Sequence, residues 1–187
     1  MSKEVPASIN TKNIFNRKKL ILINGTMGVG KSAVCRELAA QLPHNVFLDG
    51  DWCWMAHPFV VTAETKRMVM ENHAFLLNQF LHCSEYENVI FCWVMDQQTI
   101  IEALLNRLNL ESVEVKTFTL VCSETALRVR LGHDIEAGLR TADIIDRSLA
   151  RRERYRTVHS VKIDVSSISA RDTAGLIAKH LNGANEN

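Results

Sequence analysis

The chain has 187 residues, of which 47% are hydrophobic and 23% charged, and its formal net charge is +1. This length and composition are typical of one globular domain with a proper core. The near-neutral charge does not favour a nucleic-acid or membrane-surface partner, and the longest apolar stretch, residues 89–95, is too short to cross a bilayer. Five scattered cysteines without metal-ligand spacing indicate reduced thiols and a cytoplasmic protein.

Apolar runs and helical patterns alternate along most of the chain. Residues 1–18 are polar and aperiodic, so we expect a flexible N-terminal extension before a single domain at 19–187. The expected strands are Leu20–Asn24, Val46–Asp49, Val89–Met95, Val113–Val121 and Val161–Ser166. The expected helices are Lys31–Leu42, Thr62–Cys83, Gln97–Leu108, Ser123–Leu131, Ala142–Tyr155 and Ala170–Leu181. This alternation predicts an α/β fold, with helices on both faces of a parallel sheet.

A glycine-rich segment joins the first expected strand to the first expected helix. It reads Gly25-Thr26-Met27-Gly28-Val29-Gly30-Lys31-Ser32 and fits G-x-x-x-x-G-K-[ST], the phosphate-binding loop of nucleoside-triphosphate enzymes. Glycines let such a loop turn its N–H groups toward the phosphates, and the helix N-terminus adds its positive dipole end. We expect Lys31 to reach the β- and γ-phosphates and Ser32 to ligate Mg²⁺.

Two aspartates, Asp49 and Asp51, follow the second expected strand, at the edge where open α/β sheets bind ligands. Phosphoryl transfer needs one carboxylate near the metal and another near the attacking hydroxyl. On an extended segment both side chains would point the same way. We assign Asp49 to the Mg²⁺ shell and Asp51 to the acceptor hydroxyl, as base or orienter. Asp96, after the third strand, is an alternative metal ligand, and a simple Asp-Gly turn is the alternative without a function.

Aromatic residues crowd the segment after Asp51, where Trp52, Trp54, His57 and Phe59 follow one another closely. Their rings are suited to sandwich a flat or ring-shaped acceptor such as a nucleobase or a sugar. The alternative is that they pack beneath the helix that follows.

After the fourth strand the pattern indicates a helix, a loop and a second helix. Residues 132–140 lack clear periodicity and have a glycine near each end, so we expect a mobile loop. On the second helix Arg147, Arg151 and Arg154 recur at intervals of three and four residues and share a face. Arginines on a closing lid would stabilise the charge of a transferring phosphate, and a solvated basic face is the alternative.

The phosphate loop, the Leu48-Asp49-Gly50-Asp51 run and the strand pattern together resemble the P-loop small-molecule and nucleotide kinases of the gluconate, adenylylsulfate and shikimate kinase type. The chain is also similar to the tunicamycin-resistance type of P-loop protein, at Ile23-Asn24-Gly25 and at Ile145-Asp146-Arg147. The resemblance covers about residues 19–168. It implies a three-layer P-loop NTPase fold with the phosphate strand at the centre of a five-stranded parallel sheet. It also implies a substrate insertion at about 51–86 and a lid at about 132–141.

The resemblance also implies residue roles. It makes Arg147 catalytic at the phosphates, and it places Arg130 on the adenine. Arg130-Leu131 matches the start of the kinase pattern Arg-Leu-x-x-Arg, but Asp134 stands at the second arginine.

The resemblance favours an ATP- and Mg²⁺-dependent kinase that transfers the γ-phosphate to a small acceptor, with a nucleotide or nucleoside as the first candidate. A sugar acid or an antibiotic acceptor, and a tunicamycin-resistance-like ATP-binding protein without rapid turnover, stay open. A GTP-dependent switch is disfavoured because the chain has no Asn-Lys-x-Asp signature. Both a monomer and a homodimer stay open.

Overall fold

The computed structural model describes residues 17–183, so the expected N-terminal extension lies outside it apart from residues 17 and 18. The strands in this range are β1 (Lys18–Asn24), β2 (Asn45–Asp49), β3 (Asn88–Cys92), β4 (Val113–Val121) and β5 (Val161–Asp164). The α-helices are α1 (Lys31–Gln41), α2 (Ala63–His82), α3 (Gln98–Leu105), α4 (Glu124–Glu136), α5 (Ile144–Arg152) and α6 (Ala170–Asn182). Two 3₁₀ helices, η1 (Gly50–Trp54) and η2 (Glu153–Thr157), follow β2 and α5.

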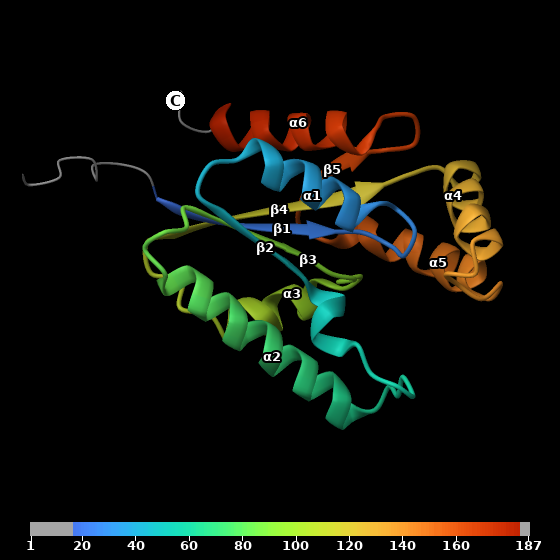
Figure 1. Cartoon of the computed structure of the whole chain (residues 1–187), viewed down its shortest axis with the longest axis horizontal. Helices are drawn as coiled ribbons and strands as arrows, with labels where there is room; N and C mark the ends of the chain where they lie inside the picture. Colours follow the sequence, from blue (N-terminus) through green and yellow to red (C-terminus); the bar gives the residue numbers. More distant parts are fainter. Residues whose placement is uncertain (1–16, 184–187) are drawn as a thin grey trace, which may run out of the picture.

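The five strands form one parallel sheet in the order β2-β3-β1-β4-β5 (Figure 1). The central strand β1 is apolar and fully buried from Leu20 to Ile23, as expected for a parallel strand that is covered on both faces. The predicted five-stranded parallel sheet, with the phosphate strand at its centre, is confirmed.

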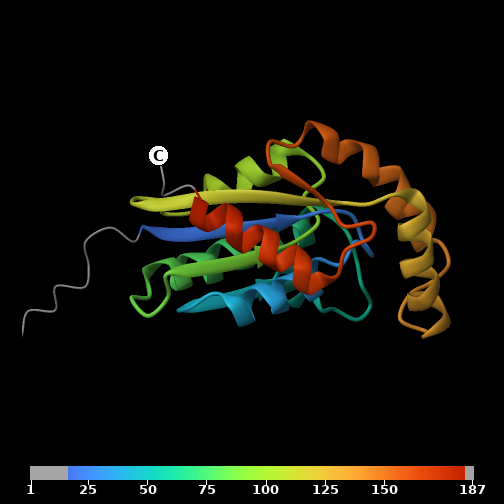
Figure 2. The same ribbon diagram turned by 90° about the horizontal axis from the view of Figure 1, so that it is seen from above.

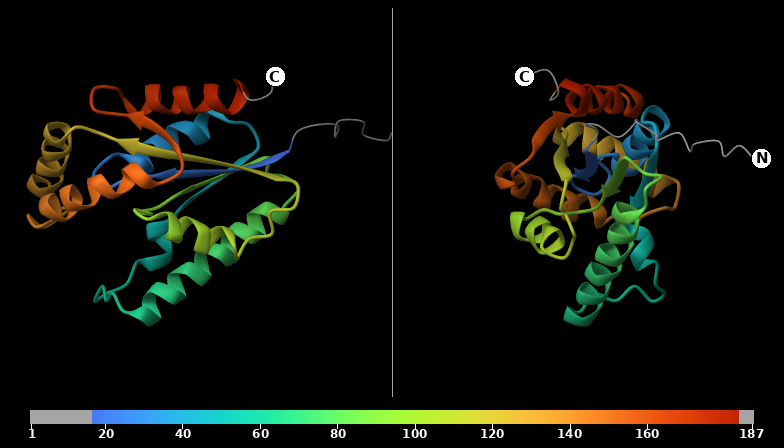
Figure 3. Two further views of the ribbon diagram at one scale, coloured as in Figure 1. Left: turned by 180° about the vertical axis from the view of Figure 1, so that it is seen from behind. Right: turned by 90° about the vertical axis from the view of Figure 1, so that its left-hand side faces the viewer.

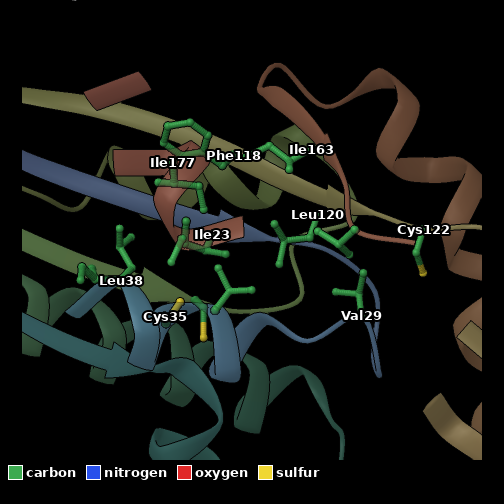
Figure 4. Packing of buried hydrophobic residues seen from close by; sticks show 14 of the residues in the cluster. Ile23, Val29, Cys35, Leu38, Phe118, Leu120, Cys122, Ile163 and Ile177 are labelled. Atoms are coloured by element: carbon green, nitrogen blue, oxygen red, sulfur yellow. The ribbon is translucent and has the colours of Figure 1, made fainter. Parts of the chain in front are cut away.

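Helices cover both faces of this sheet, so the three-layer prediction is also confirmed. α1 and α6 lie on one face and α2 and α3 on the other, while α4 and α5 lie beyond the carboxyl ends of the strands (Figures 1, 2 and 3). Beneath α1 and α6, Leu38 and Ile177 belong to the same buried cluster as Ile23 and Leu120 of the sheet (Figure 4). Among the helices formed by residues 17–183, none combines the length and apolar character needed to span a bilayer.

The third strand ends earlier than its apolar run predicts. β3 stops at Cys92, although the run continues to Met95. The side chain of Asn24 takes the place of the sheet ladder there, since its amide donates to the carbonyl oxygen of Met95 and accepts from the N–H of Met95. The chain is thus free to leave the sheet while the backbone groups of Met95 stay paired.

The buried face of α2 contains a histidine among its apolar residues. Val69, His73, Leu77 and Leu81 recur every four residues and face the core. Met68 and Phe75 of the same helix are exposed, which leaves apolar side chains available on the outer surface of α2.

The expected mobile loop at 132–140 is shorter than predicted, because α4 continues through Gly132 to Glu136. Gly138, with φ of +69°, ends the helix instead. Its N–H bonds to the carbonyl of Ile135, and the N–H of Leu139 bonds to that of Asp134. This pair of bonds is the Schellman ending that favours glycine at such a position.

We predict that alanine substitutions at Gly138 and Gly132 change the free energy of unfolding in opposite directions. Gly138→Ala should lower the free energy of unfolding by about 1 kcal/mol, because an alanine is strained at this left-handed position. Gly132→Ala should raise it by about 1 kcal/mol, because Gly132 lies inside a helix with open space around it. Urea denaturation of both variants measures these changes. Two destabilised variants would show that the helix does not pass through residue 132.

Candidate active site

The phosphate loop joins β1 to α1 at the middle of the carboxyl edge of the sheet. Gly30 is the N-cap of α1, so the first N–H groups of the helix border the loop. At Gly28 the backbone has φ of +77°, and a Cβ atom there would overlap the side chain of Leu131 on α4. Only glycine therefore suits the tip of this loop, where the loop lies in close contact with α4.

Lys31, the first residue of α1, folds back over the loop. Its ammonium donates hydrogen bonds to the carbonyl oxygens of Gly25 (2.9 Å) and Thr26 (3.1 Å). Burial lowers the pKa of Lys31, and the charges of Asp49 and Asp51 oppose part of this shift. A phosphate oxygen at the loop would compete with these two carbonyls for the ammonium.

Ser32 and Asp49 bring two oxygen atoms together beside the loop. Oγ of Ser32 donates to Oδ2 of Asp49 at 2.5 Å, and Asp49 is 7% exposed. A hydroxyl and a carboxylate are hard oxygen ligands of the kind that Mg²⁺ prefers, and Mg²⁺ usually takes few protein ligands beside phosphate oxygens and water. The pair therefore fits a Mg²⁺ ion, and its role as the metal site stays a prediction.

Asp96, the alternative metal ligand, has different partners. It is 3% exposed, and its Oδ2 accepts a hydrogen bond from Nη1 of Arg154 at 3.2 Å. The same oxygen lies 3.8 Å from Nη1 of Arg151. Two guanidinium groups thus occupy the side of Asp96 that a cation would need, which favours Asp49 as the metal ligand.

The expectation that Asp49 and Asp51 lie on an extended segment is wrong. Asp49 is the N-cap of η1, and its Oδ1 accepts the N–H of Asp51 at 3.1 Å, so the chain turns at once into a 3₁₀ helix. The side chain of Asp51 is exposed. Because the N–H of Asp51 bonds to Asp49 and Asp49 bonds to Ser32, Asp51 lies beside the phosphate loop.

His73 of α2 supports η1 through a hydrogen bond and ring packing, a role that the sequence analysis missed. Its Nε2 lies 2.9 Å from the carbonyl oxygen of Gly50, and its ring packs edge-on against Phe91 and Trp93. Burial lowers the pKa of His73, which favours the neutral ring at physiological pH. The four-residue spacing of Val69, His73 and Leu77 was the available sequence signal for this burial.

Ser148 ties α5 to the phosphate loop, and the sequence analysis did not identify this role. Its Oγ donates to the carbonyl oxygen of Met27 at 2.6 Å. Oγ1 of Thr26 donates to the carbonyl oxygen of Ser148 at 2.9 Å and lies 2.8 Å from its Oγ. Both side chains are buried, so these bonds fix α5 against the loop.

Arg130 and Arg147, whose roles the family resemblance implied, occupy different surroundings. Arg130 donates to the carbonyl oxygens of Val29 in the loop (3.0 Å) and of Val165 after β5. Arg147 instead pairs with Asp143 one turn earlier, with 2.8 Å between Nε and Oδ2, and its side chain is 59% exposed. The structure therefore brings Arg130 to the loop and leaves Arg147 on the surface of α5.

A phosphate loop after the central strand of a 2-3-1-4-5 parallel sheet defines a P-loop nucleotide-binding protein. The sequence matches the AAA domain family over residues 21–162, most of its length, and the chain belongs to this family. No curated protein sequence matches it.

Three solved structures share the fold. The tunicamycin resistance protein of Deinococcus radiodurans is 19% identical with a TM-score of 0.67, covering 88% of this chain and 96% of that one. A shikimate kinase from Acinetobacter baumannii is 20% identical with a TM-score of 0.63, covering 92% and 98%. A gluconokinase from Sinorhizobium meliloti is 18% identical with a TM-score of 0.58, covering 91% and 98%. The resemblance to P-loop small-molecule kinases in fold is thereby confirmed.

We predict that Asp49→Asn weakens the Mg²⁺-dependent part of ATP affinity by about 10- to 100-fold, because an amide is a poorer ligand for a hard cation. ATP affinity in EDTA should stay near the wild-type value. Calorimetric titration with and without Mg²⁺ measures both, and Asp96→Asn is the matched comparison. Loss of the Mg²⁺ effect in Asp96→Asn alone would reverse the assignment of the two carboxylates.

A second prediction follows from the lowered pKa of Lys31. The unfolded chain binds this proton more tightly than the folded protein does. Stability therefore rises with pH between the lowered pKa and the ordinary value of 10.5, and the charge costs stability below that range.

Lys31→Met removes this charge and keeps an unbranched side chain. It should raise the Tm of the nucleotide-free protein at pH 7 and weaken ATP binding by about 10- to 100-fold, the equivalent of one lost charged hydrogen bond. Calorimetry measures both quantities. A lower Tm would show that the two hydrogen bonds from Lys31 to the loop stabilise the folded protein by more than the burial of its charge destabilises it.

Proposed function

We propose that the protein is a phosphotransferase that moves the γ-phosphate of ATP to a hydroxyl of a small acceptor, with Mg²⁺ bound. One observation carries this proposal. The ammonium of Lys31, the paired oxygens of Ser32 and Asp49, and the exposed carboxylate of Asp51 lie together at the carboxyl edge of the sheet. These are the groups that in-line phosphoryl transfer needs, since its catalysis is mostly positioning and charge stabilisation.

Each residue has a distinct task in this proposal. Lys31 and the loop amides hold the phosphates, and Ser32 and Asp49 would hold the Mg²⁺ ion. The ion, when bound, neutralises charge that develops on the transferred group. Asp51 accepts the proton of the acceptor hydroxyl, or orients that hydroxyl toward the γ-phosphate. Arg130 borders the nucleotide, and Arg147 would reach the phosphates only after it leaves Asp143.

The substrate insertion at about 51–86 favours a nucleoside or nucleotide acceptor. Trp54 packs against Phe59 with ring centroids 5.0 Å apart. Trp52, next to Asp51, lines a cavity of about 360 Å³ between η1 and α2. The residues that line this cavity, Trp52, Cys53, Asn72, Phe75 and Leu76, include no lysine or arginine that would bind a phosphate or carboxylate of the acceptor. A neutral acceptor with a flat ring fits these walls best, which favours a nucleoside over a nucleotide or a sugar acid.

A second candidate function is nucleotide-dependent binding of a ligand, such as an antibiotic, without rapid turnover. It is favoured by the similarity to a tunicamycin resistance protein. Under either function the insertion and the lid at about 132–141 would close over the site. All five cysteines carry free thiols, which supports a reducing compartment such as the cytoplasm.

The first test is ADP production with Mg²⁺-ATP and separate pools of nucleosides, nucleoside monophosphates, sugars and sugar acids. The nucleoside pool should raise ADP above the rate with ATP alone, and Lys31→Ala should abolish the increase. If ATP binds and no pool changes the rate, ligand binding without turnover becomes the better account.

Asp51→Asn separates chemistry from nucleotide binding. It should reduce the acceptor-stimulated rate by about 100- to 10,000-fold, the usual contribution of a positioned base. The affinity for ATP should change little, because Asp51 is assigned to the acceptor. Rate assays and calorimetry on the same preparation check the two parts. An unchanged rate would remove Asp51 from the mechanism.

A further inference from the structure

A buried carboxylate outside the loop has an unusual set of neighbours. Asp96 follows Met95, whose backbone is bonded to Asn24 immediately before the phosphate loop. Its Oδ2 is the oxygen that both Arg151 and Arg154 approach. Because a buried carboxylate without a partner is strongly unfavourable, these ion pairs compensate for the burial of Asp96.

The two arginines are only partly committed to Asp96. Their side chains are 42% and 54% exposed, and each approaches the carboxylate through Nη1. A guanidinium has five N–H donors, so most of them point elsewhere. Arg151 follows Ser148 by three residues and shares its side of α5, where Ser148 bonds to the phosphate loop. The arginines therefore lie on the lid segment that is anchored to the loop.

Tyr155 of η2 carries a hydroxyl that finds no partner among the described residues. The residue is 2% exposed, and its Oη is fully shielded from solvent. Burial raises the pKa of Tyr155 strongly, and the charge of Asp96 raises it further, while those of Arg151 and Arg154 lower it. Tyr155 directly follows Arg154, which bonds to Asp96, and it packs in the same buried cluster as Met95, the neighbour of Asp96. The hydroxyl therefore lies in the same region as the carboxylate and keeps its proton, so it remains a hydrogen-bond donor.

We propose that Asp96 exchanges partners when a nucleoside triphosphate binds: Arg151 and Arg154 turn to the terminal phosphate, and the hydroxyl of Tyr155 donates to Asp96 in their place. The phosphate carries more negative charge than one carboxylate, and it therefore attracts both guanidinium groups. The new bond keeps Asp96 from being left unpaired in the interior. Tyr155 is a positioning residue here, since it acts through Asp96 and touches no substrate.

This exchange rests on the proposed function, because it assumes that the loop holds a triphosphate. It explains a feature that packing alone does not, namely a buried hydroxyl kept without a hydrogen bond. Such a group ordinarily costs stability. Replacement by phenylalanine would then be neutral or stabilising if Tyr155 were only a core residue.

The test is calorimetric titration with Mg²⁺ and either ADP or the non-hydrolysable β,γ-imido analogue of ATP. Tyr155→Phe should leave the Tm of the nucleotide-free protein unchanged or higher. It should lower the preference for the triphosphate analogue over ADP by about tenfold, the equivalent of one hydrogen bond to a charged group. Tyr86→Phe, at the other tyrosine of the chain, should leave the preference unchanged. An unchanged preference in Tyr155→Phe overturns the proposal.

A double-mutant cycle with Asp96→Asn shows whether Tyr155 acts through the carboxylate. In the Asp96→Asn background no buried charge needs a new partner, so Tyr155→Phe should change the preference by less than about twofold. An equal loss in both backgrounds would refute the exchange. These readouts need no turnover. Suppose that the wild-type protein transfers no phosphate while Tyr155→Phe still lowers the triphosphate preference only when Asp96 is present. That result would refute the proposed function and leave the exchange standing.

Discussion

The buried side chain of Asn24 holds the parts of the candidate site in register. Its Oδ1 accepts the N–H groups of Gly25 (2.8 Å) and Met95 (2.9 Å), and its Nδ2 donates to the carbonyl oxygen of Met95 at 2.6 Å. One amide thereby fixes the start of the phosphate loop to the segment that follows β3, with Asp96 next in the chain. A buried amide that lost these bonds would leave several backbone groups unpaired, so this joint is expected to be rigid.

The loop is also held by α4 and α5, at four successive residues. Ser148 accepts and donates hydrogen bonds at Thr26 and Met27, Leu131 packs against Gly28, and Arg130 bonds to the carbonyl of Val29. Because these contacts come from α4 and α5, the two helices pack directly on the phosphate loop and form part of its surroundings.

The sequence was sufficient for features that local pattern determines. The apolar run of β1, the glycine spacing and the helical pattern of α1 predicted the loop, and the alternation of elements predicted the layered sheet. Contacts between distant segments were not accessible in this way. Thr26 and Ser148 are 122 residues apart, and nothing local to either indicates their hydrogen bonds. The predictions that β3 runs to Met95 and that Asp49 lies on an extended segment were wrong for a similar reason. In both places side-chain hydrogen bonds replace the expected backbone pattern.

The measurement that tests the central claim most directly is transfer of labelled phosphate from [γ-³²P]ATP in the presence of a pooled extract of small metabolites. A phosphotransferase with this site should place the label in a new organic phosphate that mass spectrometry can identify. Its formation should require Mg²⁺ and both Lys31 and Asp51. Label that appears only in ATP and inorganic phosphate, with ATP shown to bind, would contradict the account.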